Sequence, residues 1–113
     1  MADLVDMETR RPLPAPLTAA LREDVRVIPP TIASAILFDQ TVQDYRPVLA
    51  SVTVPTLLCF GEGGSMTPAA AAYLRQHLPD ARVALFAQSN RSPHLEEPER
   101  FNAVVDGFLR ALG

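Results

Sequence analysis

The chain has 113 residues, 48% of them hydrophobic and 20% charged, and a formal net charge of −3. This length suits one small globular domain with a modest core. The sequence has no basic patch or charge run, which argues against nucleic-acid binding. Its longest apolar run is too short to span a bilayer. Residues 1–14 lack the apolar core of a signal peptide, so we expect a cytoplasmic location without membrane association.

Cysteine and histidine are scarce in this sequence. The single cysteine, Cys59, excludes an internal disulfide and a multi-cysteine metal site. It lies in an apolar run, which favours a buried structural thiol. The two histidines, His77 and His94, are too few for a zinc site without carboxylates at a recognised spacing. We therefore expect neither a metal nor another cofactor.

The first third of the chain predicts helices separated by prolines. Three prolines alternate in RRPLPAPL, residues 10–17, which favours an extended segment or linker. A short helix is expected over residues 17–28, where two prolines end it. A second helical stripe covers residues 31–45, with Thr31 as its expected cap. Residues 46–52 then predict one helical turn and a loop.

The second half predicts strand, helix, strand, helix. Residues 52–60, VTVPTLLCF, form an apolar run typical of a strand buried on both faces in a parallel sheet. Three glycines at 61, 63 and 64 predict a flexible turn. Thr67 is the expected cap of a helix over residues 68–78 that starts with proline. Residues 81–87 predict the second strand.

The final helix has the clearest periodicity. Its apolar residues recur at the spacing of a single helical face: Phe101, Val104, Val105, Phe108, Leu109 and Leu112. Two parallel strands with crossover helices place the chain in the α/β class. Such a small sheet leaves apolar edges open to pairing. The N-terminal part, a partner, or the rest of a larger fold must therefore cover it.

Two stretches carry a family resemblance: DYRPVLASVTVPTLLCFGEGGSMTP, and LPDARVALFAQSNRSPHLEEPERFNAVVDGFLRAL. Their order and spacing resemble the C-terminal portion of the α/β-hydrolase superfamily, closest to its esterase and haloperoxidase-like branch. The resemblance implies a partial α/β-hydrolase fold over residues 44–113. It also implies that residues 1–43 are a short, helical, cap-like remnant with a proline-rich start.

The superfamily's chemistry needs a serine nucleophile in a G-x-S-x-G turn, a histidine base and an orienting acid. This sequence contains no G-x-S-x-G, and GGSMT around Ser65 does not replace it. The resemblance places the family's acid position at Gly64 and its base position at Arg91. Arginine stays charged at working pH and cannot accept a proton, so it cannot be a general base.

Two residues are the remaining catalytic candidates. Glu62 lies in the acid-bearing turn and is the alternative acid, although a solvated turn carboxylate explains it as well. His94 is the alternative base, although the family often carries a second, non-catalytic histidine here. The serines at 65, 89 and 92 are expected to be turn residues. Glu96 and Glu97 precede the last helix, where negative charge suits the helix dipole.

Three hypotheses follow from the sequence. The first is a truncated esterase-like hydrolase with a degenerate active site, inactive alone, which would act on a small-molecule substrate only if completed. The second is an interaction module that pairs through its strand edges with a second copy, as a homodimer, or with a separate N-terminal half that supplies the serine. The third is an active enzyme built from Glu62, Ser65 and His94, for which the sequence offers no oxyanion hole.

Overall fold

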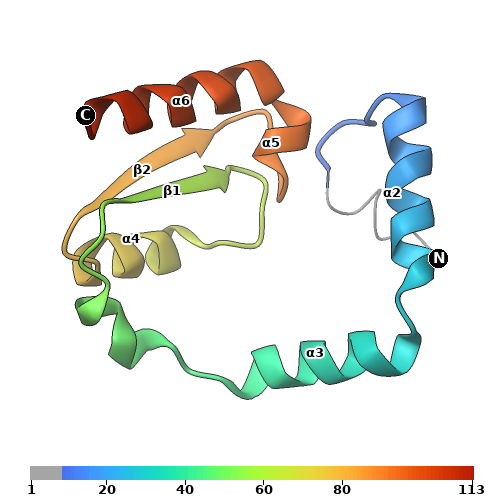
Figure 1. Cartoon of the computed structure of the whole chain (residues 1–113), viewed down its shortest axis with the longest axis horizontal. Helices are drawn as coiled ribbons and strands as arrows, with labels where there is room; N and C mark the ends of the chain where they lie inside the picture. Colours follow the sequence, from blue (N-terminus) through green and yellow to red (C-terminus); the bar gives the residue numbers. More distant parts are fainter. Residues whose placement is uncertain (1–8) are drawn as a thin grey trace.

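The computed structural model describes residues 9–113 and divides them into two regions (Figure 1). We call residues 52–113 the sheet unit and residues 9–51 the arm. The sheet unit contains a two-stranded parallel sheet with helices against it. The arm contains two helices that lie away from the sheet. No helix in the described range is long and apolar enough to cross a lipid bilayer.

The sheet unit follows the predicted order of strand, helix, strand, helix. Its elements are β1 (Thr56–Gly61), α4 (Pro68–His77), β2 (Ala81–Phe86), α5 (Pro93–Glu96) and α6 (Pro98–Ala111). β1 and β2 pair in parallel, with Thr56 opposite Ala81 and Gly61 opposite Phe86. The helices α4 and α6 lie on opposite faces of this sheet (Figure 1). The predicted α/β class and partial fold are confirmed.

Local chemistry explains where α4 begins and ends. The Thr67 hydroxyl accepts a hydrogen bond of 3.1 Å from the Ala70 N–H, which satisfies one of the unpaired donors of the first turn. Pro68 occupies the first turn, where its missing N–H costs nothing. The helix ends at His77 before Pro79, as expected.

The buried hydrophobic residues of the described range are Leu78, at the end of α4, and Phe86, which lies between the sheet and α6. Phe86 is completely buried, and its ring centroid lies 5.9 Å from that of Phe101. The Arg100 guanidinium lies 4.4 Å from the centroid of the Phe86 ring. The C-terminal part of α6 is less buried against the sheet, since Leu109 and Leu112 are 58% and 47% exposed. The predicted apolar face of α6 is therefore only partly used.

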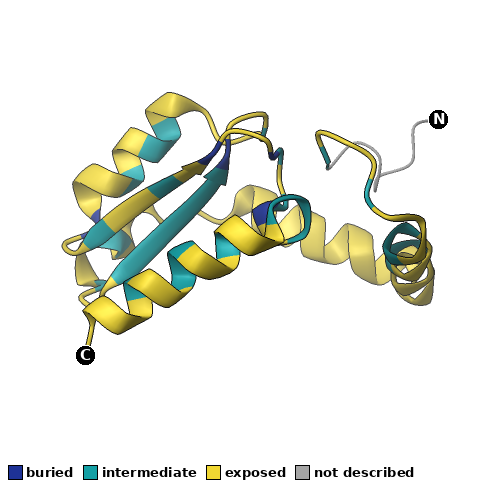
Figure 2. Ribbon diagram, turned by 90° about the horizontal axis from the view of Figure 1, so that it is seen from above, coloured by how far each residue is buried: buried dark blue, intermediate teal, exposed yellow. Residues whose placement is uncertain are grey.

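The arm contains α2 (Ala15–Val27), α3 (Pro30–Val42) and the 3₁₀ helix η1 (Arg46–Ser51). Every residue of α3 is exposed. Figure 2 shows this contrast, with exposed residues along most of the arm and the buried positions within the sheet unit. The radius of gyration is 16.1 Å, whereas a compact chain of this length has about 13 Å. The arm thus extends the molecule without adding to its core.

Four local predictions need correction. β1 begins at Thr56 rather than at residue 52, directly after Pro55, and its side chains are half-buried rather than buried on both faces. Pro16 was predicted to lie in an extended segment, but it lies inside the first turn of α2, a position that tolerates proline. Thr31 does not cap α3, since the helix already begins at Pro30. The short helix α5 falls within residues expected to form only a loop.

Candidate active site

The candidate site lies at the carboxyl ends of the two strands. The β1–α4 loop (residues 62–67) and the β2–α5 loop (residues 87–92) leave the sheet side by side there (Figure 1). In α/β proteins ligands bind beyond the carboxyl ends of parallel strands. Both loops also contain the residues that the sequence singled out.

Glycines let the two loops touch through their backbones. A Cβ atom added to Gly61 would lie 1.7 Å from the Asn90 carbonyl oxygen, and one added to Gly64 would lie 2.7 Å from the same atom. At Gly63 the added atom would lie 2.0 Å from Asn90 Oδ1. None of the three has a positive φ angle. Gly61 and Gly64 are therefore required by close packing against the Asn90 backbone, which corrects the expectation of a flexible turn.

Backbone hydrogen bonds join the loops as well. The Gly63 N–H donates to the Ser89 carbonyl oxygen at 3.0 Å. The Glu62 N–H donates to the Phe86 carbonyl oxygen at 2.9 Å and so continues the parallel ladder past the end of β1. The β1–α4 loop is consequently fixed along one side by the β2–α5 loop.

Glu97 holds the start of the β2–α5 loop. Its Oε2 accepts hydrogen bonds from the Ser89 hydroxyl at 2.6 Å and from the Gln88 N–H at 3.1 Å. Ser89 is completely buried. A short bond to a carboxylate satisfies the Ser89 hydroxyl and contributes more than a neutral hydrogen bond would. Ser89 is thus a turn residue, as predicted, and Glu97 is its partner.

Glu96 holds the second half of the same loop. Its Oε2 accepts from the Asn90 N–H at 2.8 Å and from the Ser92 N–H at 3.2 Å. Its Oε1 accepts from the backbone N–H of Arg10. Both glutamates therefore serve structure through loop hydrogen bonds, a more specific role than the helix-dipole effect expected from their position.

A cavity of about 170 Å³ opens between the two loops. Gly64 and Arg91, which the family resemblance matched to the acid and the base, both line it. The remaining lining residues are Cys59, Phe60, Gly61, Ser65, Met66 and Asn90. Cys59 is half-buried and not fully buried as predicted, and this partial burial raises the pKa of its thiol. The structure therefore brings both altered positions to one cavity.

The cavity has no proton-transfer pair. Among the residues that the structure describes, no side chain that lines it carries a carboxylate or an imidazole. Its one permanently charged side chain, Arg91, has no acceptor capacity. The lining can present hydrogen-bond donors and a positive charge to a ligand, but it cannot take a proton from a serine.

The two alternative catalytic residues lie outside this lining. Glu62 is exposed, and His94 is exposed with its ring edge-on to Phe101 at 5.9 Å between centroids. Ser65 does line the cavity. Catalytic roles for Glu62 and His94 stay predictions that this cavity does not favour.

The remaining polar candidates have local partners. His77 Nδ1 lies 2.8 Å from the Tyr73 carbonyl oxygen, and the two rings stack at 3.9 Å. Asp44 accepts hydrogen bonds from Arg46 Nη2 at 2.6 Å and Nε at 2.8 Å. The side-chain and backbone hydrogen bonds from Arg46 lower the pKa of Asp44 to about 2. Both pairs are exposed. Tyr73 and His77 lie in the same helix, α4, and Asp44 and Arg46 are two residues apart in the chain.

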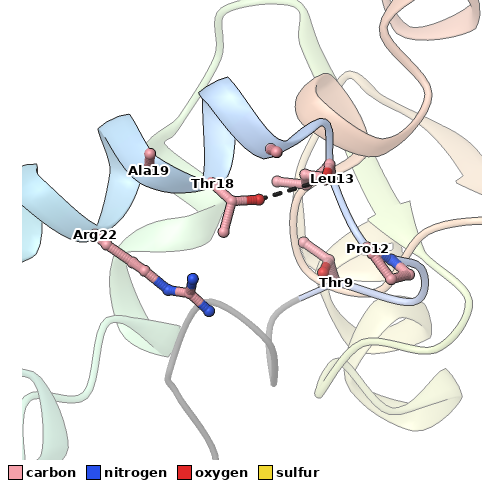
Figure 3. A pocket seen from close by; sticks show the side chains of 7 residues that line it. Thr9, Pro12, Leu13, Thr18, Ala19 and Arg22 are labelled. Atoms are coloured by element: carbon pink, nitrogen blue, oxygen red, sulfur yellow. Dashed lines mark hydrogen bonds between the residues drawn. The ribbon is translucent and has the colours of Figure 1, made fainter.

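A second cavity lies within the arm. It has a volume of about 250 Å³ and is lined by Thr9, Pro12 and Leu13 and by four residues of α2: Ala15, Thr18, Ala19 and Arg22 (Figure 3). The Thr18 hydroxyl donates a 3.4 Å hydrogen bond to the Leu13 carbonyl oxygen across its edge. Like the first cavity, it has no carboxylate or imidazole among the described residues that line it.

Two features of the site had no signal in the sequence. Asn90 is the residue against which all three loop glycines pack. Arg10 and Arg11 bind the β2–α5 loop from the arm: the Arg10 side chain donates to the Ala87 carbonyl oxygen, and Arg11 Nη2 donates to Gln88 Oε1 at 3.0 Å. Contacts between residues so far apart in sequence have no periodic pattern that could reveal them.

Comparison with known proteins supplies the relatives of the chain, which matches no protein-family model. It is 39% identical over 81 residues to a pimeloyl-[acyl-carrier protein] methyl ester esterase from Nitrosomonas europaea, a match that covers 71% of this chain and 32% of that protein. It is 32% identical over 75 residues to a proline iminopeptidase from Heyndrickxia coagulans, covering 66% and 24% respectively. The chain thus spans a third or less of these relatives.

Among solved structures, the fold is similar to that of an esterase from Exiguobacterium antarcticum. The TM-score is 0.76 at 24% identity, and the superposition covers 94% of this chain and 40% of the esterase chain. Because nearly all of this chain is covered, the likeness includes the arm as well as the sheet unit.

Proposed function

Because the chain belongs to the α/β-hydrolase superfamily, we propose that it forms the part of a hydrolase site that would hold the acid and base loops, and that it does not hydrolyse esters by itself. The observation that carries this proposal is the cavity shared by Gly64 and Arg91, whose lining has no proton acceptor. The absence of a G-x-S-x-G turn from the sequence supports it independently.

The names of the relatives support a proposal for the substrate class. Those that the chain resembles carry the names of ester hydrolases and of a peptidase, and both classes attack a carbonyl carbon. We propose that any completed site acts on an ester or a related acyl compound. The positive charge at Arg91 would lie where such a site normally needs a base.

An ester-hydrolysis assay tests this proposal. The purified chain should release p-nitrophenol from a short-chain p-nitrophenyl ester no faster than buffer, while the Nitrosomonas europaea esterase serves as the positive control. Arg91→His should be equally inactive, because a restored imidazole still lacks a serine to activate. Turnover that a serine-directed inhibitor blocks, and that Ser65→Ala or His94→Ala abolishes, would overturn the proposal.

A second candidate function is an interaction module. The observation that favours it is the free edge of β1, since the described sheet has two strands and β1 pairs only with β2. Sedimentation velocity at micromolar concentration tests the simplest form, self-association. A strict monomer would exclude a stable homodimer and leave pairing with a different polypeptide.

A further inference from the structure

Helix α3 has the surface of a buried helix but is exposed. Ile36 and Phe38 are 53% and 70% exposed, and at 100° per residue their side chains leave the helix about 160° apart. The other large apolar residues of α3 are also exposed: Ile32, Leu37 and Val42. A helix that is apolar all round is normally surrounded by protein. One copy of α3 packed on another would cover only one side.

The free edge of β1 lies beside the cavity. Thr56 and Glu62 direct their N–H groups to the β2 side, where they bond to Asp80 and Phe86. Because these groups alternate along a strand, the N–H groups at 57, 59 and 61 point to the free edge. The cavity is lined by residues of β1 and by none of β2. A strand added at this edge would therefore end next to the cavity.

The chain as a whole exposes more surface than a compact monomer of its mass. The accessible surface is 8355 Å², whereas a compact monomer of this mass exposes about 6,100 Å². The excess of roughly 2,300 Å² exceeds the 800 Å² or so that each partner contributes to a standard interface. The superposition on the longer Exiguobacterium esterase covers 94% of this chain and so includes the arm.

We propose that α3 and the free edge of β1 form one docking surface for a separate polypeptide, the nucleophile-bearing part of an α/β-hydrolase. This partner would add a parallel strand beside β1 and place apolar side chains on both sides of α3. The carboxyl end of its strand would then lie at the cavity, which is where hydrolases of this fold present their serine. The inference rests on the proposed function and names the partner that the site requires.

Co-expression tests this docking surface. The probe is the part of the Nitrosomonas europaea esterase that precedes the region of similarity, produced as a separate tagged polypeptide with the full chain. We expect the two to co-purify in equal amounts. Ile36→Glu and Phe38→Glu should each reduce the recovered complex at least tenfold, because the partner contacts opposite sides of α3. Leu109→Glu, at an exposed leucine of α6, should leave recovery unchanged.

Several results would overturn the docking proposal. One is the absence of a complex when both polypeptides are soluble. Another is a loss of complex with only one of the two substitutions, Ile36→Glu or Phe38→Glu. A third is an equal loss of complex with Leu109→Glu. A dimer of the chain alone that Phe38→Glu dissociates would identify a second copy instead. Binding to phosphatidylcholine vesicles that Phe38→Glu abolishes would identify a lipid surface. Circular dichroism confirms that each variant is folded.

The two proposals fail separately. Absence of the complex overturns the docking surface but leaves the inactivity of the isolated chain unchanged. Serine-dependent turnover by the isolated chain overturns the proposed function whether or not the complex forms.

Discussion

The sheet unit and the arm use similar apolar side chains with opposite results. Phe86 at the end of β2 is completely buried, whereas Phe38 in α3 is 70% exposed. Both residues lie in well-formed elements. The difference shows that apolar content and helical order do not by themselves create a core. Burial also requires a neighbour, and among the described residues α3 has none that covers it.

The way successive elements are connected along the chain explains why the sheet unit is packed and the arm is not. In the sheet unit each strand is followed by a helix that returns across the sheet, so neighbours in sequence become neighbours in space. The arm is held near its start by Arg10 and Arg11 on the β2–α5 loop. Between that contact and η1, no element among residues 9–113 covers the 13-residue helix α3. The arm is thus positioned at its ends and left open along its length.

Replacing the two phenylalanines should give the largest contrast. Phe86→Ala should lower the free energy of unfolding by about 3–5 kcal/mol, because it removes a buried ring and leaves a cavity under α6. Phe38→Ala should change it by about 0.5 kcal/mol or less. Urea denaturation followed by circular dichroism measures both. Equal losses of unfolding free energy would show that α3 is buried in solution and would contradict the difference between the two regions.

Gly61, at the end of β1, should tolerate no side chain. Gly61→Ala should lower the free energy of unfolding by about 3 kcal/mol, since the new methyl group overlaps the Asn90 backbone. Gly107→Ala in α6 is the control, as nothing lies within 4 Å of its added Cβ. That change should stabilise the chain by up to about 1 kcal/mol. Thermal denaturation of both variants checks this, and a neutral Gly61→Ala would mean that the loops lie apart.

The buried hydroxyl of the sheet unit should matter more than an exposed one at the end of the arm. Ser89→Ala should cost about 2 kcal/mol, because it removes a buried bond to the Glu97 carboxylate. Ser51 donates to the Val48 carbonyl oxygen in η1 but is exposed. Ser51→Ala should therefore change stability by about 0.5 kcal/mol or less. Chemical denaturation compares the pair, and the reverse ranking would contradict the assigned role of Glu97.

The sequence predicted most of the sheet unit because its rules are local. A threonine cap, a proline start and a single apolar face placed α4 and α6 within a residue or two. The apolar run ending at Gly61 placed β1, although Pro55 moved its start. The apolar run and the strand–helix–strand order predicted the parallel pairing of the two strands, which the structure confirms.

The site was less predictable because its contacts are distant in sequence. Gly64 and Arg91 were matched to family positions, and only the folded chain shows that they share a cavity. The packing of Gly61 against Asn90 depends on the approach of two loops 29 residues apart, which no periodicity records. For the arm, the sequence predicted helices correctly but could not say what would cover them.

The smallest effect should come from the ion pair of Asp44 and Arg46 in the arm. Bonds from Arg46 hold the pKa of Asp44 at about 2, below its ordinary 3.8. A depressed folded pKa adds stability above pH 3.8 that is lost as the pH falls towards 2. Because both side chains are exposed, solvent screens the pair and the change in stability should be slight. NMR titration of the Asp44 carboxyl should show the pKa returning towards 3.8 in Arg46→Gln. An unchanged midpoint would mean that the pair does not form, and that this stretch of the arm lacks even its local order.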